Sequence, residues 1–188
     1  MNLARFFAVL ALAQTLAGLK VVLRLVRTAR GERIEASDVP LPEERVTVLV
    51  PVLNERGRLS SCLAGLIAQP SEVSEILTVD GGSSDGTQDL VATFAARDSR
   101  VRMVDASPIP TGRNGKAHGL QVGLDHADPC SAWILTVDAD VRPAPALVRS
   151  LLSHAIRTDV AAVSIATTQR LSGARAQRRV HHRRDICL

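Results

Sequence analysis

Two carboxylates spaced two residues apart end the apolar stretch from Trp133 to Asp140, Trp-Ile-Leu-Thr-Val-Asp-Ala-Asp. A short apolar run of this kind is typical of a buried strand, and its acids fall where the strand should leave the sheet. In an extended chain Asp138 and Asp140 point to the same side, because side chains alternate with period two. Mg²⁺ and Mn²⁺ accept such oxygen ligands together with phosphate oxygens, so the pair predicts a divalent metal site. A short motif of this kind also arises by chance, and the prediction depends on the residues upstream.

A loop of glycine, serine and aspartate runs from Asp80 to Thr87. Its two adjacent glycines allow positive φ and close backbone approach to a ligand. Asp80 can accept hydrogen bonds from a base or a sugar, and Asp85 can cap the following helix. The alternative is a tight turn with a helix cap and no ligand. The loop does not fit the G-x-G-x-x-G dinucleotide motif.

Lys116 ends the stretch Gly112-Arg-Asn-Gly-Lys116 and is one of only two lysines in the chain. A P-loop would need a glycine at Pro110 and a hydroxyl residue at Ala117, so that motif is absent. A lysine flanked by glycine before a helix can still neutralise the charge of a diphosphate. A solvent-facing loop lysine is the alternative.

The elements that must position these residues alternate between strand and helix. Strands are predicted at 46–50, 76–80, 101–104, from Trp133 up to the two acids, and at 160–166; helices are predicted at 59–67, 90–95, 120–124 and 146–156. This alternation predicts an α/β fold with a mainly parallel sheet covered on both faces. Ligands of such sheets bind outside the carboxyl ends of the strands. The residues expected together at that edge are Asn54, Glu55, Asp80 to Asp85, Asp138 and Asp140; Asp128 and Asp159 are expected elsewhere.

The N-terminal segment has a different composition. Residues 3–26 are mostly apolar, with a densest part of 14 residues from Phe6 to Leu19. That part is shorter than the roughly 20 residues that span a bilayer, so residues 1–30 could be a marginal transmembrane helix, an interfacial helix or an uncleaved signal-like segment. Five cations follow the apolar core and one precedes it, which predicts that the rest of the chain lies on the cytoplasmic side of the cytoplasmic membrane. Residues 31–45 read as a polar linker.

Composition excludes several other classes. The net charge is +4, but the chain has only three phenylalanines and one tryptophan on which bases could stack, so no nucleic-acid partner is expected. The three cysteines lack the spacing of a disulfide framework or a zinc site, and Cys62 is expected to be buried on a helix. Neither a Ser-His-Asp order nor a G-x-S-x-G elbow is present.

Taken together, these motifs resemble the family 2 glycosyltransferases of the GT-A fold. The resemblance spans 46–166 and lies in four motifs in order: Val-Pro-Val-Leu-Asn-Glu at 50–55, Val-Asp-Gly-Gly-Ser-Ser-Asp-Gly-Thr at 79–87, Gly-Lys-Ala at 115–117 and Asp-Ala-Asp at 138–140. The apolar leader and the Pro-x-Gly-Arg-x-Gly-Lys stretch are similar to membrane-associated members that act on lipid-linked or polyprenoid acceptors, some of them hopanoid- or carotenoid-associated.

The resemblance implies a donor site for a UDP- or GDP-sugar and a lipid or saccharide acceptor. Pro51, Asn54 and Glu55 would shape the nucleoside pocket, and Asp80 would bind the base. Ser83 and Asp85 would support that loop, with Lys116 near the nucleotide or its diphosphate. Asp138 would contact the ribose or sugar and, with Asp140, hold Mg²⁺ or Mn²⁺. Inverting transfer also needs a general base, which in this family is a later aspartate.

The chain departs from the family after Asp140, because only 48 residues follow. They include a basic tail, 171–188, expected to be disordered, in which Asp185 is a poor candidate for the base. We therefore expect a GT-A donor-binding domain at 46–170 that is incomplete at its C-terminus, by truncation or frameshift. Two alternatives remain open: a catalytically silent nucleotide-binding or interaction module, and a sugar-nucleotide-forming nucleotidyltransferase.

Overall fold

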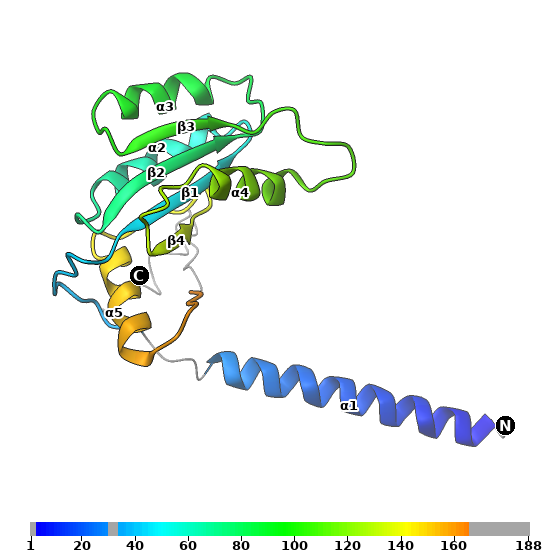
Figure 1. Ribbon diagram of the computed structural model, residues 1–188. Helices are drawn as coiled ribbons and strands as arrows, with labels where there is room; N and C mark the ends of the chain where they lie inside the picture. The colour runs from blue at the N-terminus through cyan, green and yellow to red at the C-terminus, as the bar shows by residue number, and fades with distance from the viewer. Residues whose placement is uncertain (1–2, 30–33, 166–188) are drawn as a thin grey trace, which may run out of the picture. The chain divides into compact units, whose positions relative to one another are not determined.

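The computed structural model describes residues 3–29 and 34–165 (Figure 1). The chain divides into two compact units, Met1–Arg33 and Ile34–Leu188. In the first unit, Leu3–Ala29 form one helix, α1, in which the side chains from Leu10 to Val26 are exposed. Among the described residues, no helix combines the length and the apolar content that a bilayer crossing requires.

The second unit is built on a parallel sheet of four strands in the order β3-β2-β1-β4. The strands are β1 Val46–Val52, β2 Val73–Asp80, β3 Val101–Asp105 and β4 Trp133–Thr136. The helices are α2 Arg56–Ile67, α3 Thr87–Ala95, α4 Gly115–Asp125 and α5 Leu147–Thr158. Helices alternate with strands because each parallel pair needs a crossover connection. The predicted α/β fold with a parallel sheet is confirmed.

Helices cover both faces of the sheet (Figure 1). On one face, α2, α3 and α5 bury apolar side chains in one core cluster with alternate residues of β1, such as Val48 and Val50. On the other face, Leu120 of α4 packs against Leu49, Leu77 and Val79. Strands buried on both faces read as continuous apolar runs, and β1 is the clearest case.

The segment before β1, which is predicted from the sequence to be a linker, makes specific contacts within the second unit. Leu41 N donates to the buried carboxylate of Glu72, which also pairs with Arg149 at 2.8 Å. Trp133 Nε1 donates to Glu44 Oε2 at 2.6 Å. This part of the chain has no strand or helix but is attached by hydrogen bonds.

Two strand predictions are corrected. The strand that begins at Trp133 is predicted to be buried. It ends at Thr136, before the two acids as expected, but its residues alternate between half-buried and exposed. The reason is its place at the edge of the described sheet, where β1 is its one neighbour among the described strands. Residues 160–165 form neither strand nor helix. A strand needs a neighbour for its backbone N–H and C=O groups, and α5 and its left-handed cap at Asp159 do not lead this segment into a ladder. Ala166, the tail 171–188, Asp185 and Cys187 lie outside the described residues.

Candidate functional site

The register of the strands brings the predicted residues to one edge of the sheet. Val52 of β1 lies opposite Asp80 of β2, and Leu49 lies opposite Thr136 of β4. All pairings are parallel, so the carboxyl ends meet at one edge, as predicted from the sequence. Asp128 lies at the other end of the strands, in an ion pair with Arg45.

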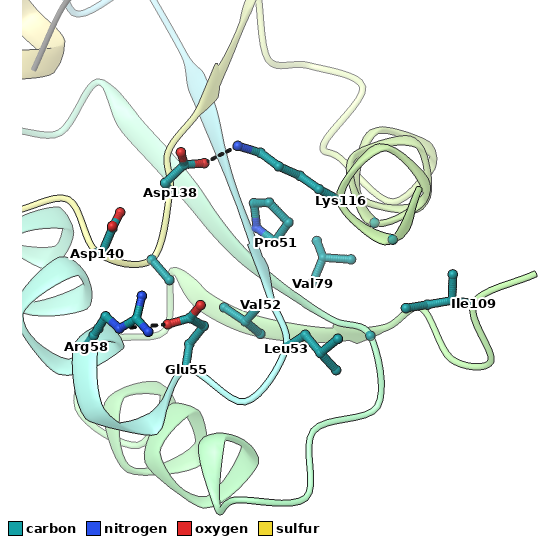
Figure 2. A pocket seen from close by; sticks show the side chains of 14 residues that line it. Pro51, Val52, Leu53, Glu55, Arg58, Val79, Ile109, Lys116, Asp138 and Asp140 are labelled. Carbon is teal, nitrogen blue, oxygen red and sulfur yellow. Dashed lines mark hydrogen bonds and ion pairs between the residues drawn. The ribbon is translucent and has the colours of Figure 1, made fainter. Parts of the chain in front are cut away.

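A cavity of about 310 Å³ opens at this edge (Figure 2). It is lined by Pro51, Val52, Leu53, Glu55, Arg58, Val79, Gly81, Ile109, Gly115, Lys116, Gly119, Asp138, Ala139 and Asp140. The predicted residues on its wall are thus Pro51, Glu55, Lys116, Asp138 and Asp140.

Asp138 and Asp140 both face the cavity. Val137, just before Asp138, and Ala139, between the two aspartates, are both buried. The period-two alternation of an extended chain therefore continues beyond the end of β4. Val137 N donates to Leu49 O at 3.0 Å, which keeps this segment beside β1. The predicted common orientation of the two carboxylates is confirmed.

Lys116 contacts Asp138 across the cavity. Its Nζ donates to Asp138 Oδ1 at 2.5 Å, and the two side chains are 57% and 55% exposed. Lys116 is the second residue of α4. Asn114 caps the start of this helix, because its Oδ1 accepts a hydrogen bond from Ala117 N. An Asn cap of this kind satisfies one of the free N–H groups at a helix start.

Cys62 of α2 lies directly behind the Asp138 backbone. Its thiol donates to Asp138 O at a sulfur–oxygen distance of 3.6 Å. Burial, followed by the charges of Asp140 and Asp138, raises the pKa of the Cys62 thiol to about 12. Cys62 therefore stays protonated at neutral pH and acts as a packed hydrogen-bond donor, which agrees with the predicted burial.

The loop after Asp140 is fixed to α2. The buried amide of Gln69 donates to Gly65 O and Ala144 O and accepts from Val148 N. A Cβ on Gly65 would lie 2.8 Å from Pro143 O, so the loop approaches the helix at a point where only glycine fits. These contacts hold the chain on the C-terminal side of the two carboxylates.

Asp80 is buried behind the cavity wall instead of lining it. Its carboxylate accepts hydrogen bonds from Ser83 N, Ser83 Oγ and Gln88 Nε2. The neighbouring Gly81 forms that part of the wall. Ser83 Oγ also accepts from Asn54 N, and Asn54 Oδ1 accepts from Ser84 N. The structure thus places Asn54, Asp80 and Ser83 in a network that shapes two loops.

Asp85 links two helix starts. Its carboxylate accepts from the backbone N–H groups of Arg56, the first residue of α2, and Thr87, the first residue of α3. The Thr87 hydroxyl also donates to it at 2.6 Å. The capping role predicted from the sequence therefore extends to a second helix.

Residues 47–186 match the sequence profile of the family described as Glycosyl transferase family 2. This chain belongs to glycosyltransferase family 2. The match covers most of the chain and includes every motif from which the resemblance was inferred.

Curated family 2 relatives are similar over part of the chain. Glycosyltransferase GlyG of Streptococcus pneumoniae is 29% identical over 97 residues, which cover 52% of this chain and 30% of the relative. The 4,4′-diaponeurosporenoate glycosyltransferase of Staphylococcus aureus is 28% identical over 113 residues, which cover 60% of this chain and 28% of the relative. The chain thus spans less than a third of the length of these relatives.

Among solved structures, the chain is similar to the mannosyltransferase PcManGT from Pyrobaculum calidifontis in complex with GDP-Man and Mn²⁺. The two are 28% identical with a TM-score of 0.53, over 85% of this chain and 46% of that one. This similarity agrees with the GT-A fold expected for a family 2 glycosyltransferase.

Several residues that line the cavity were not predicted from the sequence. Ile109, in the loop before α4, lies close to Gly81 and Gly115 and forms one side of the wall. Arg58 follows Glu55 by three residues, in the first turn of α2. The helical spacing i, i+3 could have placed it on the same side as Glu55; no sequence signal singled out Ile109.

The two carboxylates suit a divalent cation that has other ligands as well. Asp138 and Asp140 supply oxygens, which are hard donors. No group of three or more His, Cys, Asp or Glu able to hold a metal occurs in residues 3–29 and 34–165. The donor set therefore fits a cation that takes its remaining ligands from phosphate oxygens and water, the usual state of protein-bound Mg²⁺.

Proposed function

We propose that this chain is the donor-binding part of a metal-dependent, inverting glycosyltransferase that transfers a sugar from a UDP- or GDP-sugar to a lipid or saccharide acceptor. The observation that carries this proposal is the convergence of Lys116, Asp138 and Asp140 on one cavity at the carboxyl ends of parallel strands. Family membership and the similarity to a mannosyltransferase in complex with GDP-Man and Mn²⁺ support it.

The proposed binding mode follows from charge. Asp138 and Asp140 would hold Mg²⁺ or Mn²⁺, which when bound offsets the negative charge of the diphosphate. Lys116 lies at hydrogen-bonding distance from Asp138 and is therefore close enough to share in neutralising the leaving nucleoside diphosphate. Pro51 and Glu55 form the wall on which the nucleoside would lie. The base that inverting transfer requires is not assigned in the described part of the chain.

We also propose that α1 associates with the cytoplasmic membrane and that the domain lies on its cytoplasmic side. Lys20 and Arg24 lie one helical turn apart on α1, among exposed leucines and valines. Such a helix can bury apolar side chains in the interface while its cations bind anionic lipid.

The test is calorimetric titration of the full chain with UDP and GDP, with and without Mn²⁺. We expect nucleotide binding to be at least about tenfold tighter with Mn²⁺, because the cation would offset the negative charge of the diphosphate. Release of free sugar or transfer to an added acceptor would establish the enzyme. Binding without turnover would favour the silent module, whereas diphosphate release from a nucleoside triphosphate and a sugar phosphate would favour the nucleotidyltransferase. Absence of nucleotide binding in the presence of Mn²⁺ would overturn the proposal.

A further inference from the structure

Arg58 is a second cation on the cavity wall. It lies in the first turn of α2, one helical turn after Glu55, and lines the same cavity as Lys116 and the two aspartates. In Figure 2, Arg58 and Lys116 approach the cavity from different elements, α2 and α4, with Asp138 and Asp140 on the strand-end segment between them. A ligand in the cavity can therefore meet a cation on each side.

The guanidinium of Arg58 is only weakly engaged by the protein. Its Nε lies 3.6 Å from Glu55 Oε2, and the Arg58 side chain is 66% exposed. Within the described ranges, this ion pair is the single polar contact of the side chain. Glu55 Oε2 is buried and has no hydrogen-bond partner there. A distance of 3.6 Å is too long for a hydrogen bond, so the N–H donors of Arg58 remain available to a ligand.

The charges around the cavity indicate what that ligand would be. The wall carries three acids, Glu55, Asp138 and Asp140, and two cations, of which Lys116 already contacts Asp138. A nucleoside diphosphate adds further negative charge, so Lys116 and a divalent cation alone would leave the loaded site with an excess of negative charge. A guanidinium binds carboxylate and phosphate oxygens through two parallel hydrogen bonds.

We propose that Arg58 binds an oxyanion group of the substrate. The group is either the diphosphate of the donor or a carboxylate or phosphate on the acceptor. This inference rests on the proposed function, because it assumes that the cavity binds a nucleotide-sugar.

The test compares the full chain with Arg58→Gln, Arg58→Lys and a control, Arg97→Gln. Arg97 is an exposed arginine just after α3, at the other end of the strands, so its substitution makes the same change in net charge away from the cavity. Thermal unfolding first shows whether the variants are folded. Calorimetry then measures the binding of UDP and GDP with Mn²⁺, and the binding of inorganic phosphate to the chain loaded with UDP and Mn²⁺.

If the donor diphosphate is the partner, Arg58→Gln weakens UDP and GDP binding at least about tenfold, in the range of a lost charge-assisted hydrogen bond. If the acceptor supplies the oxyanion, Arg58→Gln leaves nucleotide binding unchanged and weakens phosphate binding to the loaded chain. In both cases Arg58→Lys has an intermediate affinity, because an ammonium keeps the charge but cannot form the two parallel hydrogen bonds of a guanidinium. Arg97→Gln binds as wild type does.

The inference is overturned if wild type binds nucleotide and Arg58→Gln changes neither titration. If wild type itself binds no nucleotide with Mn²⁺, the proposed function fails and the inference fails with it. The wild-type titration thus separates the two failures.

Discussion

Asp138 and Asp140 reach the cavity through the residues that alternate with them. Val137 and Ala139 fill the core under the two carboxylates, and Cys62 holds the backbone between them from behind. Each carboxylate therefore depends on apolar neighbours for its direction. The common direction of Asp138 and Asp140 is thus set by the burial of Val137 and Ala139 on the opposite side of the chain.

Replacing Asp140 with asparagine should remove one of the two proposed protein ligands while preserving side-chain volume. We expect Asp140→Asn to weaken Mn²⁺-dependent nucleotide binding at least about tenfold, since neutral amides are poorer ligands for a hard cation. Calorimetry with UDP or GDP in the presence of Mn²⁺ measures the effect.

The matched control for this change is Asp89→Asn, an exposed aspartate in the first turn of α3. It should bind nucleotide as wild type does. Unchanged affinity in Asp140→Asn would remove the carboxylate pair from the donor site.

At the scale of elements, Asp85 should couple the starts of α2 and α3. The hydrogen bond from the Thr87 hydroxyl holds the pKa of Asp85 below its ordinary 3.8. Desolvation acts in the opposite direction and raises this pKa, and the backbone N–H groups of Arg56 and Thr87 lower it further. A lowered pKa in the folded state means that the stabilisation is present above that ordinary value and is lost as the pH falls through the folded-state pKa.

We therefore expect Asp85→Ala to lower the midpoint of thermal unfolding by several degrees near neutral pH. Its difference from wild type should shrink as the pH falls below 3.8 and disappear below the lower pKa of the folded-state carboxylate. Scanning calorimetry over a pH series measures this. A difference that stays constant with pH would show that the charge of Asp85 is not what stabilises the helix starts; Asp89→Ala is the control on the same helix.

The packing of α4 on the sheet depends on Gly123. A Cβ at Gly123 would lie 2.8 Å from Val79 Cγ2, whereas one at Gly119 would lie at an ordinary 3.6 Å from Pro51 Cβ. Overpacking costs about 1–3 kcal/mol, and replacing a helical glycine with alanine gains about 1 kcal/mol.

Gly123→Ala should therefore be destabilising or at best neutral, while Gly119→Ala should be stabilising. Urea unfolding of the two variants measures the difference in the free energy of unfolding. Equal stabilisation of both would show that α4 is not held at the close approach described.

The sequence predicted most elements, because amphipathic helices and buried strands carry periodic signals that depend on local residues. It could not predict that β4 is a half-exposed edge strand or that residues 160–165 form none. Both depend on which strands lie beside them, which is a property of the sheet and not of a short segment. The i, i+3 spacing could place Arg58 on the same side of α2 as Glu55, but the role proposed for it depends on the cavity that α2 helps to form.

At the scale of the whole chain, the site residues separate into two groups, which sequence analysis distinguished only for Ser83 and Asp85, predicted to support their loop. Glu55, Lys116, Asp138 and Asp140 line the cavity, whereas Asn54, Asp80, Ser83 and Asp85 hold its loops. Lys116 lies at the start of α4 and the others follow strand ends, and acidic side chains serve both purposes. Their hydrogen-bond partners in the structure distinguish the residues that line the cavity from those that hold the loops.

The membrane proposal predicts that the full chain binds anionic vesicles in preference to zwitterionic ones. Lys20→Glu reverses one exposed charge on α1, and a cation near an anionic surface contributes about 1 kcal/mol. We expect vesicle affinity to fall roughly thirtyfold for this change of two charge units. Cosedimentation measures it, with Arg97→Glu as the control; equal binding by the two variants would locate the lipid contact outside α1.

The contact between Lys116 and Asp138 has a thermodynamic consequence. Under the proposed function, a metal ion bound by Asp138 would free the ammonium of Lys116 to bind the diphosphate, and a diphosphate bound by Lys116 would free Asp138 to bind the metal ion. Linkage then requires that metal and nucleotide each raise the affinity for the other by one common factor. In a Lys116→Met variant, no ammonium has to leave Asp138 before a metal ion binds. This variant should therefore lose the part of the cooperativity that arises from the exchange.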